Sequence, residues 1–217
     1  MAFQRAKYRQ SGASLVEFMI ASLVGSIALA IIGSVFLSNQ RVALQRSQHI
    51  MLQQQMSMVM HQLKRDVLRA GYNGINNHSV IFSDQDDLLA VTETSIGYVY
   101  YTPHSSSGKF SHTLYRLDNG ILRYRQINCT QIIDYENFKC PEEEEEEEEE
   151  KNKSASFYSL FEPKQVRVTQ FSVKRFPING QAVQSAVISI DVSASLVANP
   201  AVAHSMQLHI TQRNWQS

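Results

Sequence analysis

The sequence has none of the motifs that mark the common catalytic classes. G-x-S-x-G, H-E-x-x-H, the P-loop and G-x-G-x-x-G are all absent from its 217 residues. An acidic group at Asp84, Asp86 and Asp87 lies in a polar stretch, where a solvated turn explains it better than general acid–base chemistry. We therefore expect no catalytic residue, no metal site, no cofactor and no enzymatic activity.

Net charge is lacking as well. The chain has 20 basic and 20 acidic residues, and nine of the acids form an unbroken run of glutamates at 142–150. The remaining charges are dispersed, so no concentrated basic face indicates a nucleic-acid partner. The glutamate run lacks the shaped loop of spaced oxygen ligands that calcium sites use.

Cysteine and proline are scarce. Cys129 and Cys140 are the only cysteines, and they are close in the sequence. Such a pair can bind a metal, take part in redox chemistry or form a local disulfide. No second Cys or Cys–His pair completes a zinc site, and the spacing is not Cys-x-x-Cys. A disulfide is favoured if the domain lies outside the cytoplasm. The first proline is Pro103, so no helix before it has a proline kink.

What the sequence does contain is a long apolar segment near its N-terminus. A helix over residues 13–37 would be about 37 Å long, enough to cross a hydrocarbon core of about 30 Å. Only basic charges precede the segment, which favours a cytoplasmic N-terminus and places the rest of the chain across the membrane. A secretory signal is cleaved after its apolar stretch, whereas the candidate site here, Gly12-Ala13, precedes it.

The one charge within this segment is Glu17. A carboxylate inside the membrane costs roughly 3 kcal/mol or more unless it finds a partner, so it indicates a function. Cleavage after Gly12 would create an α-amino group at Ala13. A neighbouring subunit could present that amine to Glu17, and the pair would set the axial register between subunits. The alternative is that Glu17 reaches the membrane interface or is protonated.

The run Gly12-Ala13-Ser14-Leu15-Val16-Glu17, between a basic leader and an apolar helix, resembles the prepilin peptidase recognition motif of type IV pilins and type II secretion pseudopilins. The resemblance implies cleavage between Gly12 and Ala13, N-methylation of Ala13 and a role for Glu17 in subunit docking. Ala13 stands where the family usually has Phe. The lack of a proline kink differs from the major pilins and favours a minor subunit.

Beyond the apolar segment, the hydrophobic pattern becomes one-sided. Apolar residues at spacings of three and four predict that the helix continues to about Ala70 and is ended by Gly71. We expect this stripe to be core rather than a ligand site; it comprises Leu52, Met56, Val59, Leu63 and Val67, widened by Leu44, Met60 and Leu68. The stretch 65–72 resembles the helix end of the PilW and J-type branch of minor pilins.

The remainder of the chain predicts β-strands. The turn Asp118-Asn119-Gly120 joins the segments 114–117 and 121–127 as a hairpin, and Asn179-Gly180 separates 166–178 from 182–196. Alternation at 188–196, with serines and Asp191 between apolar residues, predicts one buried face and one solvent face. Further strands are expected at 98–101 and around 206–210. The expected fold class is α+β, with a long N-terminal α-helix, transmembrane then amphipathic, packed on a mainly antiparallel β-sheet head.

These predictions divide the chain into a cleaved leader (1–12), a transmembrane and polymerisation helix (13–37), an amphipathic helix (38–71) and a periplasmic β-rich head domain (72–217). We expect a minor type IV pilin, anchored in the inner membrane and later incorporated into a pilus. Its expected partners are other minor and major pilins, prepilin peptidase and the inner-membrane pilus assembly platform.

Three alternatives remain: a J-type minor pseudopilin of a type II secretion system, a monomeric membrane-tethered periplasmic binding module and a tethered periplasmic enzyme. Glu17 favours a subunit that assembles, because a simple anchor gains nothing from a buried acid. The missing catalytic motifs disfavour the enzyme.

Overall fold

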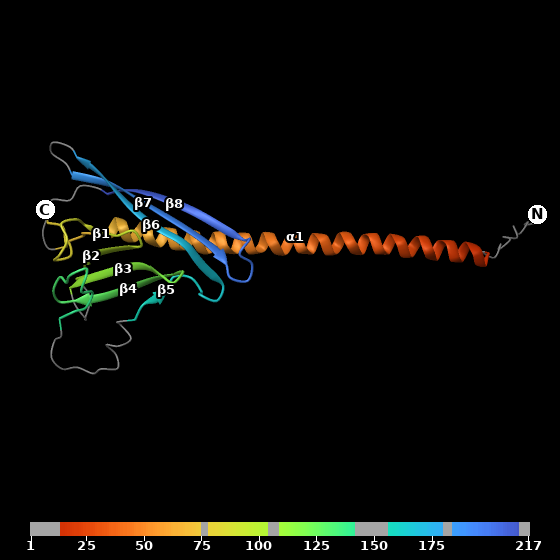
Figure 1. Ribbon diagram of the computed structural model, residues 1–217, viewed down its shortest axis with the longest axis horizontal. Helices are drawn as coiled ribbons and strands as arrows, with labels where there is room; N and C mark the ends of the chain where they lie inside the picture. The colour runs from red at the N-terminus through yellow and green to blue at the C-terminus, as the bar shows by residue number, and fades with distance from the viewer. Residues whose placement is uncertain (1–13, 75–77, 104–108, 142–155, 180–183, 213–217) are drawn as a thin grey trace, which may run out of the picture. The chain divides into compact units, whose positions relative to one another are not determined.

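The computed structural model describes residues 14–74, 78–103, 109–141, 156–179 and 184–212 (Figure 1). The features predicted for the leader, for Gly12-Ala13, for the glutamate run and for Gly180 lie outside these residues. The chain forms two compact units, Met1–Ser47 and Gln48–Ser217. The second is called the head unit below.

A single helix, α1 (Leu15–Arg69), contains both the apolar and the amphipathic segments that the sequence predicted. Gly71 follows its end with a positive φ of 76°, a conformation that favours glycine. The Gly71 N–H donates to the carbonyl oxygen of Val99 at 2.8 Å in strand β2 (Ser95–Tyr101). Gly71 thus ends the helix as predicted and connects the end of the helix to the first sheet by a hydrogen bond.

Within the head unit, one face of α1 is buried in the core. The predicted stripe is confirmed, since six of its side chains are at most 5% exposed: Leu52, Met56, Val59, Met60, Leu63 and Val67. Two residues expected to widen the stripe do not belong to it. Leu68 is 58% exposed because it follows Val67 by about 100° around the helix. Leu44 is 60% exposed and precedes the head unit.

Two antiparallel sheets complete the head unit. The first has the strand order β1-β2-β3-β4-β5, with β1 (Leu89–Val91), β2, β3 (Phe110–Asp118), β4 (Ile121–Cys129) and β5 (Tyr158–Ser159). The second contains β6 (Val166–Asn179), β7 (Gln184–Leu196) and β8 (Ala203–Gln212), in that order. The C-terminal part of α1 lies between them (Figure 1), and side chains from the helix and both sheets form one core. The predicted α+β fold is confirmed.

The predicted hairpin turn joins β3 to β4, where Asn119 and Gly120 have φ angles of 51° and 77°. In β7 the predicted apolar row is buried, with Ile188 and Ile190 fully enclosed. The opposite row is less exposed than expected, because Ser189 is only 4% exposed. Its hydroxyl accepts a hydrogen bond from Gln207 Nε2 at 3.4 Å, so a side chain of β8 covers it.

The first sheet is covered on both faces. One face packs on α1, and the other carries a second core that includes Phe82, Leu114, Ile127, Ile133 and Phe138. Most of this cover comes from irregular segments before β1 and after β4. This second layer was not predicted from the sequence.

Candidate assembly site

The first described residues of α1 form a reciprocal cap around Glu17. The Ser14 Oγ accepts a hydrogen bond from the Val16 N–H at 3.2 Å, and the Glu17 Oε2 accepts one from the Ser14 N–H at 2.9 Å. This is the capping box S-x-x-E, which satisfies backbone donors that a helix start leaves free. The signature is present in the sequence at Ser14 and Glu17, but the cap was not among the predictions. Glu17 therefore has a local structural role.

The apolar part of α1 has no cover from the described residues. Every large apolar side chain between Leu15 and Leu37 is more than half exposed. The helix is long and apolar enough to cross a membrane by length and composition. Such a surface is stable only against lipid or against other apolar helices, because exposure to water costs about 25 cal/mol per Å².

The other polar groups of this segment are satisfied within the helix. The hydroxyls of Ser22, Ser26 and Ser34 donate to main-chain carbonyls three or four residues earlier, at 2.9, 2.7 and 2.8 Å. Serine can therefore face an apolar environment at little cost. Glu17 is the one ionisable side chain between residues 14 and 37. Its Oε1 has no hydrogen bond to any described residue and is open to a further donor.

The sites predicted at Gly12 and Ala13 lie outside the described residues, which begin at Ser14, one residue before α1. Cleavage after Gly12, methylation of Ala13 and pairing of its amine with Glu17 therefore rest on the sequence.

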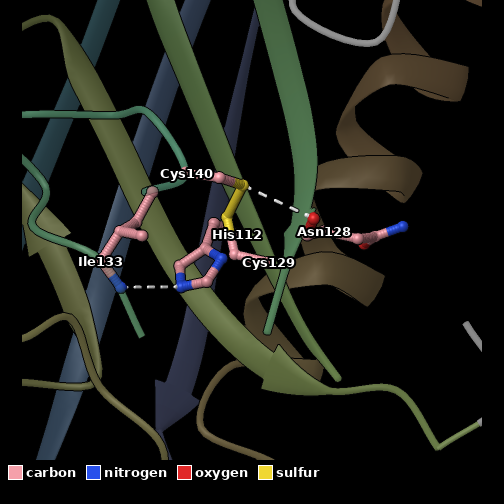
Figure 2. Close-up of a disulfide and its surroundings, with 5 residues drawn as sticks. All are labelled: His112, Asn128, Cys129, Ile133 and Cys140. Carbon is pink, nitrogen blue, oxygen red and sulfur yellow. Dashed lines mark hydrogen bonds between the residues drawn. A yellow bond between two sulfur atoms is a disulfide. The ribbon is translucent and has the colours of Figure 1, made fainter. Parts of the chain in front are cut away.

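The two cysteines form a disulfide in the head unit. Cys129, at the end of β4, bonds to Cys140 with an S–S distance of 1.98 Å and a Cα–Cα distance of 5.5 Å. Figure 2 shows the bond beside His112, with Cys140 Sγ 3.5 Å from the carbonyl oxygen of Asn128. This is a contact rather than a hydrogen bond, because a disulfide sulfur carries no hydrogen. The bridge closes the segment that covers the second face of the first sheet.

His112 lies beneath this segment and is fully buried in β3. Its Nε2 accepts a hydrogen bond from the Ile133 N–H at 3.2 Å (Figure 2), which places the proton of the neutral ring on Nδ1. Burial lowers the pKa of His112 to about 4, because the charged ring would lose its hydration; weaker interactions with the backbone at Phe110 and Ile127 act in the opposite direction. The burial of His112 was not predicted from the sequence, although His112 alternates with Phe110 and Leu114 in the strand.

Two of the three acids expected in a solvated turn, Asp84 and Asp87, have structural partners. The carboxylate of Asp84 accepts hydrogen bonds from the N–H groups of Tyr135 and Glu136 at 2.8 and 3.2 Å. Although partial burial acts against them, these donors lower the pKa of Asp84. Asp87 forms a 2.7 Å ion pair with Arg175 of β6. Through its two hydrogen bonds, Asp84 thus holds the segment closed by the disulfide in place.

Together, an exposed apolar N-terminal helix, a single carboxylate in its first turn and a disulfide-closed head built on two antiparallel sheets define a pilin-like protein. Residues 45–212 match the family described as prepilin peptidase-dependent protein B, and the chain belongs to this family. The matched region begins after the apolar segment, so it is independent of the motif at Gly12 to Glu17. Neither the curated proteins nor the solved structures contain a match to the chain.

Proposed function

We propose that this protein is a minor type IV pilin, a structural subunit that helps to initiate or cap a pilus and has no catalytic role. The observation that carries the proposal is Glu17, the single ionisable side chain of the exposed apolar segment 14–37, five residues after Gly12. The family name, which includes dependence on prepilin peptidase, supports processing at this motif.

Processing and assembly follow from this arrangement. The chain is inserted with its leader in the cytoplasm and its head in the periplasm, and the peptidase cuts between Gly12 and Ala13. The new α-amino group of Ala13 then pairs with Glu17 of a neighbouring subunit and fixes the axial register. Oε1 of Glu17 is available for this pair while Oε2 retains the Ser14 cap. Burial of apolar side chains between helices, at about 25 cal/mol per Å², supplies most of the driving force.

The minor pilin assignment is favoured by two features of the sequence. No proline occurs before Pro103, and residues 65–72 are similar to the helix end of the PilW and J-type branch. The same branch contains the J-type minor pseudopilins of type II secretion systems, which form the second candidate. The partners proposed are other minor and major pilins and the inner-membrane pilus assembly platform.

N-terminal mass spectrometry of the membrane-extracted protein tests the class. We expect the mature chain to begin at Ala13, with a methylated amine, in cells that contain the prepilin peptidase. In cells without the peptidase, the leader should remain. A chain that still begins at Met1 in peptidase-containing cells would reduce the protein to a plain membrane-tethered domain.

Substitutions at the cap separate the two roles of Glu17. Glu17→Gln retains a capping-box side chain but removes the charge, so we expect normal cleavage and loss of incorporation into filaments. The matched control is Ser14→Ala, which removes the hydroxyl cap at about 1 kcal/mol and keeps the carboxylate; it should still be incorporated. Incorporation of Glu17→Gln at the wild-type level would show that Glu17 serves only the cap and that the register hypothesis is wrong.

A further inference from the structure

Strand β8 is an open edge of the second sheet. It runs for ten residues, Ala203–Gln212, and β7 is the only described strand that pairs with it. The pairing has an unbroken register from Ala203 to Gln212, without a bulge. No other described segment forms a backbone hydrogen bond with β8. Half of the backbone donors and acceptors of the strand therefore face outward.

The other three sheet edges are protected and β8 is not. Natural proteins protect edges by short strands, charged side chains, proline and bulges. β1 and β5 have three and two residues. β6 contains Lys174, Arg175 and Pro177, and it has a bulge between Val168 and Gln170. In addition, the Val168 N–H donates a hydrogen bond to the carbonyl oxygen of Gly120, in the turn between β3 and β4. β8 contains no Asp, Glu, Lys, Arg or Pro.

An incompletely covered apolar surface continues from β8 onto α1. Met206 and Leu208, which face the helix, are only half-buried, whereas the neighbouring row of β7 is buried. Ser57 Oγ donates to Met206 Sδ at 3.8 Å and so identifies the side of α1 next to β8. Ile50 and Leu68 are 7 and 11 residues from Ser57, which places them on the same side at about 100° per residue. They are 54% and 58% exposed.

We propose that β8 pairs with an edge strand from the head of a different pilin-like subunit of the same filament. The proposal rests on the function proposed above. The partner strand would be uncharged, with apolar side chains facing α1 to cover Met206 and Leu208 and small polar side chains facing outward. Main-chain hydrogen bonds would supply the affinity and the apolar row the specificity, as in other cases of strand addition. Anchoring in one membrane raises the effective concentration of the partner.

The direction of β8 argues against a second copy of this chain. Gln48 Oε1 accepts a hydrogen bond from Asn199 Nδ2, just before β8, and Ser57 contacts Met206 further along, so β8 and this part of α1 run in the same direction. In an antiparallel pair of two β8 strands, the two Gln48 residues, where each chain leaves its head unit, would lie at opposite ends of the pair, although both chains would be anchored in one membrane. Parallel pairing avoids this conflict but is less stable per residue.

Site-specific cross-linking in the native host tests the proposal. In Gln207→Cys the introduced cysteine is the only free thiol, because Cys129 and Cys140 are bonded to each other. A short photoreactive cross-linker is attached to this thiol in intact cells, and the adduct is identified by mass spectrometry. The matched control is Gln170→Cys, on β6, since Gln170 and Gln207 border the same shallow groove on either side of β7.

We expect Gln207→Cys to give one adduct with a head segment of a different protein that has a prepilin-type N-terminus, and Gln170→Cys to give none. No adduct, equal adducts from both positions, an adduct with a second copy or an adduct with a protein of another class would each overturn the proposal. A charge on the edge provides a second measurement. Gln207→Lys should lower recovery of the partner with this protein several-fold, while Gln170→Lys should not.

The outcome is separable from that of the proposed function. If the mature chain begins at Ala13 but Gln207→Cys gives no such adduct, only the role of β8 is wrong. If the chain retains its leader in the presence of the peptidase, the filament function itself fails.

Discussion

At the scale of single residues, ionisation of the buried His112 lowers the stability of the head unit at acidic pH. Its pKa is lowered from 6.5 to about 4 by burial, so the unfolded chain binds a proton at higher pH than the folded chain. The contribution of the neutral ring to the free energy of unfolding is fully present above about pH 6.5 and is lost as the pH falls toward 4. The total loss is up to about 3 kcal/mol. The lowered pKa of Asp84, in the exposed segment beside the ring, contributes to the same acidic curve.

A comparison with His112→Gln isolates the contribution of the ring. Glutamine retains an acceptor for the Ile133 N–H but has no titratable group. We expect the free energy of unfolding of the full chain in detergent, measured by urea titration, to fall less steeply between pH 6.5 and 4 in the variant. Equal pH dependence in both proteins would show that the carboxylates alone account for the acid sensitivity.

Glu17 shows that one side chain can meet two requirements. A capping box needs an acceptor three residues after the cap, and a register pair needs a carboxylate close to the new N-terminus. The cap uses Oε2 of Glu17, and the proposed register pair would use Oε1. The cap at the helix start therefore leaves one oxygen of Glu17 for the proposed register pair.

At the scale of elements, the disulfide holds the second layer of the first sheet. Cys129 and Cys140 are 11 residues apart, and closure of such a loop stabilises a fold by about 3 kcal/mol. Between them, Ile133 and Phe138 cover that face of the sheet. We expect the double variant Cys129→Ser, Cys140→Ser to unfold at a clearly lower urea concentration than the wild type.

Reduction of the wild type is the control for that prediction. A reducing agent should lower its midpoint to that of the double variant and leave the variant itself unchanged. If the oxidised and reduced proteins unfold at the same midpoint, the segment is held by its packing and by the Asp84 hydrogen bonds rather than by the bridge.

Elements whose pattern is local were predictable from the sequence. The buried stripe of α1 follows from spacings of three and four, the turn at Asn119 follows from its glycine neighbour, and the row at Ile188 and Ile190 follows from alternation. β1 and β5 were missed because three and two residues carry too little periodicity. The division into two sheets depends on pairing between distant segments and leaves no local pattern.

The candidate site shows the same division between local and long-range information. The apolar helix and Glu17 could be predicted because each is a departure from ordinary composition at one place in the chain. The burial of His112 depends on a cover segment that lies more than 20 residues later in the sequence. The contact of α1 with the first sheet likewise joins residues that are far apart in the sequence. The Tyr115 hydroxyl donates a hydrogen bond to Asp66 and accepts one from Gln62 Nε2 at 3.1 Å.

At the scale of the whole molecule, the boundary between the two units falls within α1, between Ser47 and Gln48. The core of the head unit uses helix residues from Leu52 onward, whereas every described residue before Gln48 is exposed. The helix thus belongs to two environments, and the head unit needs only its second part to complete a core.

Truncation tests this division. A chain of residues 48–217, secreted into an oxidising compartment, should fold, form the Cys129–Cys140 bond and unfold at nearly the same urea concentration as the full chain in detergent. A chain of residues 61–217 lacks Leu52, Met56, Val59 and Met60, which are at most 5% exposed. Loss of each costs about 2–5 kcal/mol, and the sum approaches or exceeds the whole stability of an ordinary domain, about 5–15 kcal/mol. Circular dichroism measures the folding of both chains, and a count of free thiols measures the formation of the disulfide. An unfolded 48–217 chain would show that the head unit requires the apolar segment, and a stable 61–217 chain would show that the two sheets hold together without the helix stripe.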